Sequence, residues 1–217
     1  MEAILENLVR SPKFPEYVDE LVEFRRRETE ARARFRETMD EDVRAEFING
    51  EVVTEMSSRD RHTLSVHYIS ALVMLFVRVR KSGAARSEQA LTEFPRNDYA
   101  PDLCFWAKEK SSQFTGETTL YPIPDFVCEV LSPSTETRDR GVKFEDYAAH
   151  GVSEYWIVDA DRRMIEQYVA KDGVYELVGK FTTGLVRSRA IDGFEMSVDS
   201  AFDDERNLDA QRKLLAP

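Results

Sequence analysis

Apolar side chains recur at helical spacing in two long stretches of the chain. From Phe14 to Met39 they form a narrow stripe at spacings of three, four and seven, and charged residues cover the other faces. From Asp60 to Lys81 apolar residues surround much of the circumference, which is typical of a helix packed against a sheet, and Gly83 acts as a stop signal. We therefore predict one helix that docks by a single stripe and one buried helix.

Shorter apolar runs between turn signals predict strands. Residues 45–56 are interpreted as a hairpin, because Asn49-Gly50 supplies the positive φ angles that a two-residue turn needs. A second hairpin is predicted for residues 164–180 around Asp172-Gly173, and the tail 182–217 has strand-like and then helix-like pieces. Further strands are predicted at residues 85–94, 100–106, 125–131 and 154–159.

A helix is predicted between the last two of these strands. Hydroxyl side chains from Ser132 to Thr135 are suited to cap its start, Glu136 lies in its first turn, and Gly151 stops it after His150. The strand–helix–strand unit over residues 125–159 should form a right-handed parallel crossover. The order of elements predicts an α/β fold, a mixed sheet flanked by helices.

The charge balance bears on the class of partner. The 217-residue chain has a net charge of −11, and its length fits one domain, or one domain with an appendage. An acidic balance argues against broad non-specific binding to nucleic acid, which depends on neutralising phosphates, but it leaves room for a local basic patch. Four arginines at or near the starts of the two helices predict a basic rim: Arg59, Arg61, Arg138 and Arg140.

Cysteine usage and hydropathy give an expected location. Cys104 and Cys128 lie in strand-like runs and are expected to be reduced and buried, and the absence of any CxxC pattern argues against structural zinc. The most apolar stretch, Ile69 to Val79, is too short to span a bilayer, and the first residues lack the features of a signal peptide. We expect a cytoplasmic protein without a membrane partner.

Two carboxylates interrupt strands that are otherwise apolar. Asp102 shares a strand face with Cys104 and Trp106, and Glu129 shares one with Val127. Buried charges need partners, and two acids on neighbouring strands would repel one another unless a hard cation such as Mg²⁺ lay between them. Spacing alone leaves two ordinary alternatives open: a solvated position at a strand end, or a pair with an arginine.

Lys143 follows on the next helix and has two interpretations. The ordinary one is an ion pair with Asp139 at spacing i,i+4 on a wet surface. The functional one is a side chain that reaches over the strand ends to orient a water or to neutralise developing negative charge. His62, at the start of the apolar helix, is more typical of a core or capping residue, and Glu51 of a charge at a strand edge.

Several stretches together resemble the Uma-type family of putative restriction endonucleases, which belongs to the PD-(D/E)XK nuclease superfamily. The resemblance covers roughly Ala45 to Phe202; it does not extend to the long helix before Met39. Its most specific part is the run Glu-Val-Leu-Ser-Pro-Ser-Thr, followed by a lysine-bearing helix and EYWIVD. The matching stretches are FINGEVV (47–53), SEQALTEF (87–94), APDLCFW (100–106) and residues 124–159.

The resemblance implies a restriction-endonuclease-like core with added β-hairpins over residues 45–202, a helical extension over 1–44 and a tail over 203–217. Asp102 matches the Asp of the PD element and Glu129 the (D/E) element; both would hold Mg²⁺ or Mn²⁺, with the Val130 carbonyl as a further donor. The lysine usually found two residues after the second acid is replaced by Leu131. Lys143 would substitute for it as the third catalytic residue.

The function implied is metal-dependent hydrolysis of DNA phosphodiester bonds by an endonuclease. Glu51, His62 and Glu88 match recurrent positions of the family and are further candidates for the site. Restriction-type nucleases often act as dimers, and the stripe on helix 14–39 offers a surface for a homodimer. Two alternatives are a non-catalytic module that binds nucleic acid or protein with the nuclease fold, and a structural or interaction protein that uses the long helix as an arm.

Overall fold

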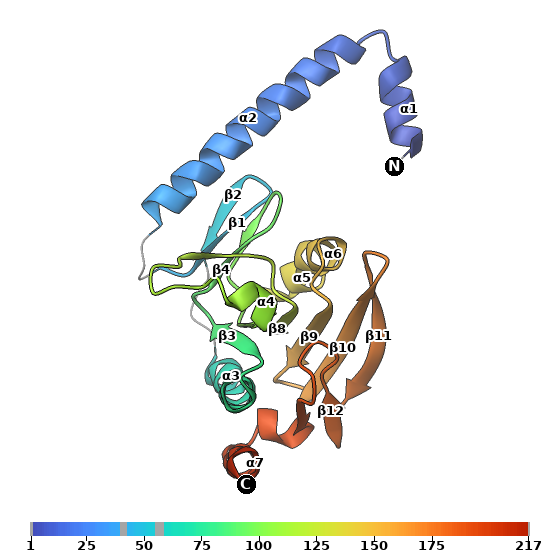
Figure 1. Cartoon of the computed structure of the whole chain (residues 1–217). Helices are drawn as coiled ribbons and strands as arrows, with labels where there is room; N and C mark the ends of the chain where they lie inside the picture. Colours follow the sequence, from blue (N-terminus) through green and yellow to red (C-terminus); the bar gives the residue numbers. More distant parts are fainter. Residues whose placement is uncertain (1, 40–42, 55–58, 217) are drawn as a thin grey trace.

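The computed structural model describes residues 2–39, 43–54 and 59–216, with side chains from Ile4 onward. Two β-sheets and their covering helices form the body of the molecule, and two N-terminal helices extend from it (Figure 1). The α/β architecture predicted from the order of elements is confirmed.

The larger sheet has six strands in the order β11-β10-β9-β8-β6-β3. Strands β8 and β9 are parallel, as predicted for the unit over residues 125–159, and β6 runs antiparallel beside β8. The predicted hairpin at Asp172-Gly173 is confirmed, because both residues have positive φ between β10 and β11. The bounds are β3 Gly83–Ser87, β6 Leu103–Ala107, β8 Phe126–Val130, β9 Glu154–Asp159, β10 Met164–Lys171 and β11 Val174–Phe181.

The smaller sheet has five strands in the order β2-β1-β5-β4-β7. Its hairpin turns at Asn49-Gly50 with φ angles of 52° and 90°, as the sequence predicts, whereas residues 55 and 56 lie outside the described part. The strand predicted over 85–94 is wrong as one element: Glu88, with φ of 61°, breaks it into β3 and β4, which belong to different sheets. The bounds are β1 Ala45–Ile48, β2 Glu51–Thr54, β4 Leu91–Glu93, β5 Asp98–Tyr99 and β7 Leu120–Tyr121.

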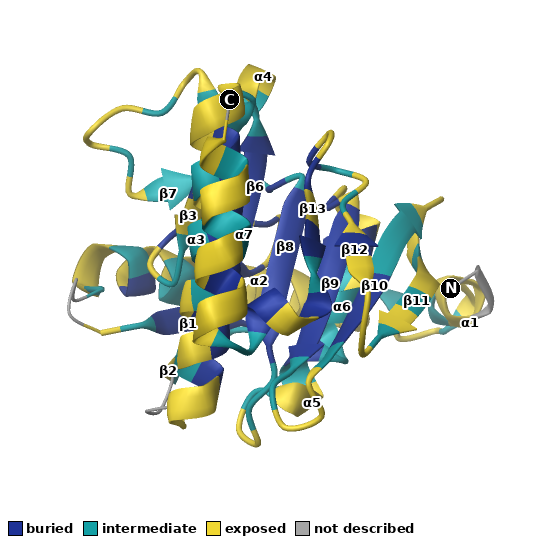
Figure 2. Ribbon diagram, turned by 90° about the horizontal axis from the view of Figure 1, so that it is seen from below, coloured by how far each residue is buried: buried dark blue, intermediate teal, exposed yellow. Residues whose placement is uncertain are grey.

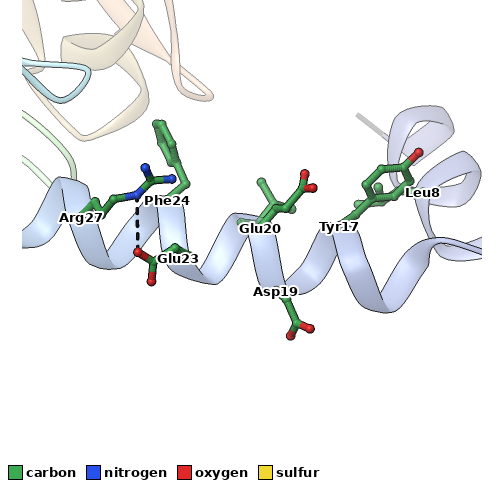
Figure 3. A pocket seen from close by; sticks show the side chains of 8 residues that line it. Leu8, Tyr17, Asp19, Glu20, Glu23, Phe24 and Arg27 are labelled. Carbon is green, nitrogen blue, oxygen red and sulfur yellow. Dashed lines mark ion pairs between the residues drawn. The ribbon is translucent and has the colours of Figure 1, made fainter.

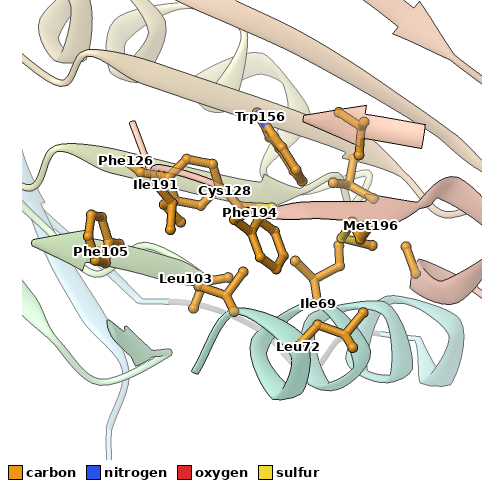
Figure 4. Packing of buried hydrophobic residues seen from close by; sticks show 14 of the residues in the cluster. Ile69, Leu72, Leu103, Phe105, Phe126, Cys128, Trp156, Ile191, Phe194 and Met196 are labelled. Carbon is orange, nitrogen blue, oxygen red and sulfur yellow. The ribbon is translucent and has the colours of Figure 1, made fainter. Parts of the chain in front are cut away.

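Helix α3 (Asp60–Arg80) covers one face of the six-stranded sheet. Its apolar side chains meet those of the sheet and of the C-terminal segment in one core (Figure 4). Helix α7 (Asp204–Leu215) packs beside it, and both helices expose their outer sides, while the strands beneath are buried (Figure 2). Before α7, the C-terminal segment forms a two-stranded sheet of β12 (Leu185–Arg187) and β13 (Glu195–Ser197), followed by the 3-10 helix η1 (Val198–Ala201).

The length and hydropathy of α3 correct one expectation. With 21 residues it is long and apolar enough to cross a membrane by length and composition, and it is the sole such helix in the described residues. The sequence expectation considered only residues 69–79. Half of the apolar window is buried inside the fold, where it packs on the sheet.

The helix predicted over residues 132–150 is two helices, which is a second correction. Helix α5 (Glu136–Asp139) and helix α6 (Val142–Ala149) are separated at Gly141, where φ is −115° and ψ is −106°. A Cβ at Gly141 would lie 2.7 Å from the Thr137 carbonyl oxygen, so the close turn depends on glycine. Thr135 precedes α5 but its side chain makes no capping hydrogen bond, contrary to the prediction. A short helix, α4 (Lys108–Ser111), follows β6.

Helix α2 (Phe14–Thr38) has two different halves. Its C-terminal half is fixed to the smaller sheet: Phe35 is buried, and Arg32 and Arg36 both pair with the fully buried carboxylate of Asp98. Its N-terminal half and helix α1 (Glu2–Arg10) project beyond the body (Figure 1). The predicted single-stripe docking therefore holds for one half of the helix.

Candidate active site

The two acids singled out in the sequence lie side by side. Leu103 on β6 pairs in register with Cys128 on β8, so Asp102 stands next to Glu129. The Asp102 N–H donates to Glu129 Oε2 over 3.1 Å, and the Val130 N–H donates to Asp102 Oδ2 over 2.7 Å. Both residues are buried, at 4% and 2% exposure. The structure thus brings the carboxylates together on adjacent strands, as the strand pattern predicts.

Lys143 reaches the same place from α6. Its ammonium lies 3.0 Å from Glu129 Oε1, 2.9 Å from Glu46 Oε1 and 3.5 Å from Asp139 Oδ1. The pair with Asp139 therefore exists, but the expectation of a wet surface is wrong, because Lys143 is 1% exposed. Helix α6 begins directly after Gly141, so Lys143 lies in its first turn, against Glu46 and Glu129 of the two sheets.

Glu46 is a member of this cluster that the sequence did not single out. It lies on β1, is fully buried, and accepts a hydrogen bond from the Ala100 N–H over 2.9 Å. Its Oε2 has no hydrogen-bond partner among the described residues, and the same holds for Asp139 Oδ1. A charged residue in the apolar run Ala45–Ile48 is the signal that could have identified it.

Two basic side chains hold Asp102 from the other side. Arg44 Nη2 lies 2.9 Å from Asp102 Oδ1, and His62 Nε2 lies 3.6 Å from Asp102 Oδ2. Burial raises the pKa of Asp102, but His62 and the charge of Arg44 outweigh it and lower the pKa to about 2. Burial lowers the pKa of His62, and Asp102 more than reverses this, so that the pKa is raised. The structure brings His62 into the site as a partner of Asp102.

The second acid has the opposite electrostatic setting. Burial raises the pKa of Glu129 well above its usual value; Lys143 opposes the shift, while the neighbouring acid Asp139 adds to it. Burial likewise raises the pKa of Asp139. Adjacent carboxylates with pKa values moved in opposite directions are typical of functional sites, although buried ion-pair networks produce them too.

The two other candidates differ in position. Glu51 is exposed at the start of β2 and stays outside the buried cluster. Glu88 is half-buried, and its backbone N–H donates to the Asp102 carbonyl over 3.1 Å, while its side chain lines a neighbouring cavity of about 220 Å³ together with Arg44. The structure therefore links Glu88 to the site through its backbone and does not bring Glu51 there.

The four arginines of the predicted rim have separate surroundings, and Arg138 is half-buried. Arg59 and Arg61 line a small hollow beside His62 and Pro133, and Arg61 forms an ion pair with Asp161. Arg140 pairs with Glu136 and with the buried Glu166. Acids thus offset part of the positive charge of these arginines. A basic rim around the site stays a prediction.

The donor set fits a hard divalent cation. Of the residues that the structure describes, no group of three or more His, Cys, Asp or Glu is arranged to hold a metal. Mg²⁺ needs fewer protein ligands, since it is bound by one or two carboxylates and keeps several waters. Asp102 and Glu129 supply such carboxylates, and the buried oxygens of Glu46 and Asp139 that lack hydrogen-bond partners lie around the same ammonium.

Comparison with known proteins identifies the fold and the family. A solved structure, that of a putative nuclease belonging to DUF820 from Anabaena variabilis ATCC 29413, matches with a TM-score of 0.63 and 18% identity, over 73% of this chain and 89% of the other. At that identity the likeness shows the fold. No curated protein matches. The sequence profile of the Uma2 family, described as putative restriction endonuclease, matches residues 22–199, and the chain therefore belongs to this family.

Proposed function

We propose that this protein is a metal-dependent endonuclease that hydrolyses phosphodiester bonds in DNA. The proposal rests on the contact of Asp102, Glu129 and Lys143 in the protein interior, with the lysine ammonium 3.0 Å from Glu129 Oε1. The lysine comes from a helix rather than from the position two residues after the acid, yet its charge reaches the same carboxylate. Membership of the Uma2 family supports the reaction class.

Asp102 and Glu129 are the proposed ligands of Mg²⁺ or Mn²⁺, with the Val130 carbonyl as a further oxygen donor. When bound, such a cation lowers the pKa of a water and stabilises charge on a phosphate. Arg44 and the Val130 N–H hold the Asp102 carboxylate, and the Tyr147 hydroxyl, which donates to Glu129 Oε1 over 3.0 Å, holds the other. These contacts fix both acids before any ligand arrives.

Lys143 is the proposed group that orients the attacking water and offsets the negative charge that develops on the phosphate. Glu46 holds its ammonium against Glu129 from the opposite sheet, since β1 belongs to the smaller sheet and β8 to the larger. Glu46 is therefore a positioning residue in this proposal. Two copies would be needed to cut both strands of a duplex in one binding event.

One observation favours the alternative of a non-catalytic module with the same fold. Both oxygens of Asp102 and of Glu129 already have hydrogen-bonding or ionic partners within the protein. The protein therefore holds both acids in an ion network without any metal ion. Glu129 Oε2 accepts one hydrogen bond, from the Asp102 N–H, and an oxygen with two lone pairs can still bind a metal, so the network is compatible with metal binding as well.

Nicking of supercoiled plasmid DNA separates the two functions. The proposal predicts nicking in Mg²⁺ or Mn²⁺, none in EDTA, and a loss of about a hundredfold or more in Asp102→Asn. Glu117→Gln, which changes an exposed loop acid, is the matched control and should nick like the parent. Absence of nicking by the parent on every DNA tested would support the non-catalytic module.

A further inference from the structure

The projecting N-terminal helices carry an unusual amount of exposed apolar surface. In the docked half of α2 the large apolar side chain Phe35 is buried. By contrast, Leu21 is 56% exposed, Val22 is 63% exposed and Phe24 is 49% exposed. The exposed large apolar side chains of α1 and this half of α2 are Ile4, Leu5, Val9, Tyr17, Val18, Leu21, Val22 and Phe24.

Three of these side chains, Tyr17, Leu21 and Phe24, line a groove along α2. Leu8 of α1 and four charged residues of α2 complete its lining. Leu8 on α1 and Tyr17 on α2 lie beside each other, and Phe24 points from α2 further along the same helix (Figure 3). The groove has a volume of about 680 Å³. Soluble chains seldom leave so many large apolar side chains of one segment open to water, so their position on a projecting helix pair indicates a protein partner.

The charges along α2 indicate which partner fits. From Phe14 to Phe24 the helix has four acids, Glu16, Asp19, Glu20 and Glu23, and no base. Three consecutive arginines, residues 25–27, follow at once. A second copy of α2 that runs antiparallel would place its arginines beside the acids of the first, and the reverse contact would follow by symmetry. Parallel pairing would instead put arginines beside arginines.

The ion pairs that these arginines form within one copy would not prevent them from pairing with acids of a second copy. Arg26 pairs with Glu23 and Glu30, and Arg27 pairs with Glu23, all within α2 and all with side chains about half exposed or more. Ion pairs this exposed to water contribute little to stability, so contacts between copies can replace them at little cost.

The area is sufficient for a stable pair. The eight exposed apolar side chains represent on the order of 700 Å² of surface per copy, near the roughly 800 Å² that each partner contributes to a standard interface. The family profile begins at residue 22, so α1 and most of this half of α2 lie ahead of the matched region. Val22, Phe24 and the three arginines lie within the matched region, so the surface spans its start.

We propose that α1 and the N-terminal half of α2 form a self-association surface, on which the same helices of a second copy pack with α2 antiparallel to α2. The exposed apolar side chains of both helices supply the contact area, and the acidic and arginine segments of α2 set the direction. This interface does not depend on hydrolysis of DNA, and a catalytically inactive protein would still form it.

Light scattering after size exclusion measures the association. The full chain is expected to be a dimer at tens of micromolar, and Leu21→Glu is expected to shift it to monomer. Leu208→Glu is the matched control, because Leu208 is 45% exposed on α7, at the end of the molecule opposite the N-terminal helices (Figure 1), and it should leave the dimer intact. A monomeric parent, or equal dissociation in both variants, overturns the proposal.

Cross-linking with a short bismaleimide tests the direction. Cys104 and Cys128 are buried, so added surface cysteines are the reactive ones. Val22 lies near the expected two-fold axis, and Val22→Cys should cross-link to itself. Lys13→Cys, nine residues away, would lie roughly 27 Å from its copy in an antiparallel pair but about 10 Å in a parallel one. Cross-linking of both variants, or of neither, contradicts the antiparallel arrangement.

Discussion

Replacing Lys143 by methionine removes the central positive charge of the buried cluster. The change keeps an unbranched side chain but removes the ammonium. In the parent the ammonium lies 2.9, 3.0 and 3.5 Å from the carboxylates of Glu46, Glu129 and Asp139. Those three side chains are at most 3% exposed, so water cannot screen them. Breaking a buried pair in this way costs about 3–5 kcal/mol.

The free energy of unfolding, measured by urea titration at neutral pH in EDTA, should fall by about 3–5 kcal/mol in Lys143→Met. Lys171→Met is the matched control: Lys171 is 66% exposed and pairs with an exposed Glu176, so its loss should cost less than about 1 kcal/mol. Equal stability of the two variants would refute the described burial of Lys143.

The same variant should respond more strongly to a divalent cation. With the ammonium removed, the acids lack a competitor for Mn²⁺, so the midpoint of thermal unfolding of Lys143→Met should rise more with Mn²⁺ than that of the parent does. The cation would restore folding but not the orientation of water, and plasmid nicking should stay at least about a hundredfold below the parent. Unimpaired nicking would remove Lys143 from the mechanism.

Three further predictions concern other parts of the molecule. Glu46→Gln keeps the bond to the Ala100 N–H but removes a charge beside the lysine, and it should reduce cleavage about 10–100-fold with little change in fold by circular dichroism. Asp98→Asn deprives the two α2 arginines of their buried partner; it should destabilise the docked half by about 2 kcal/mol and speed proteolysis within α2. For Glu166, burial raises the pKa, but Arg140 and Tyr168 outweigh this and lower it to about 2. Because that pKa is lower folded than unfolded, its contribution of at most about 3 kcal/mol is present above roughly pH 4.5 and is lost as pH falls toward 2; Glu166→Gln should flatten this part of the stability curve.

The elements that local rules govern could be predicted from the sequence. The Asn49-Gly50 and Asp172-Gly173 turns and the parallel pairing of β8 with β9 follow from backbone preferences and chain order. The meeting of Asp102 with Glu129 also follows, because each acid interrupts an apolar run and strand alternation sets its face. These features need no knowledge of distant contacts.

The rest depends on contacts between distant segments. The residues around Glu88 give no signal of a positive φ angle. The hydrophobic pattern therefore could not predict that residues 85–94 are divided between two sheets. Glu46 joins the site only because the smaller sheet brings β1 against α6 and β8, 97 residues of chain separating it from Lys143. The spacing of Asp139 and Lys143 predicts their pairing, but its burial depends on tertiary packing.

The rate of DNA cleavage as a function of Mn²⁺ concentration, compared between the parent and Glu129→Gln, tests the central claim most directly. Glutamine keeps the size of the side chain and an acceptor for the Asp102 N–H, but it removes the negative charge proposed to hold the cation. The account predicts saturable, metal-dependent cleavage by the parent and a loss of about a hundredfold or more in the variant. Equal cleavage by both proteins, or cleavage that persists in EDTA, would contradict it.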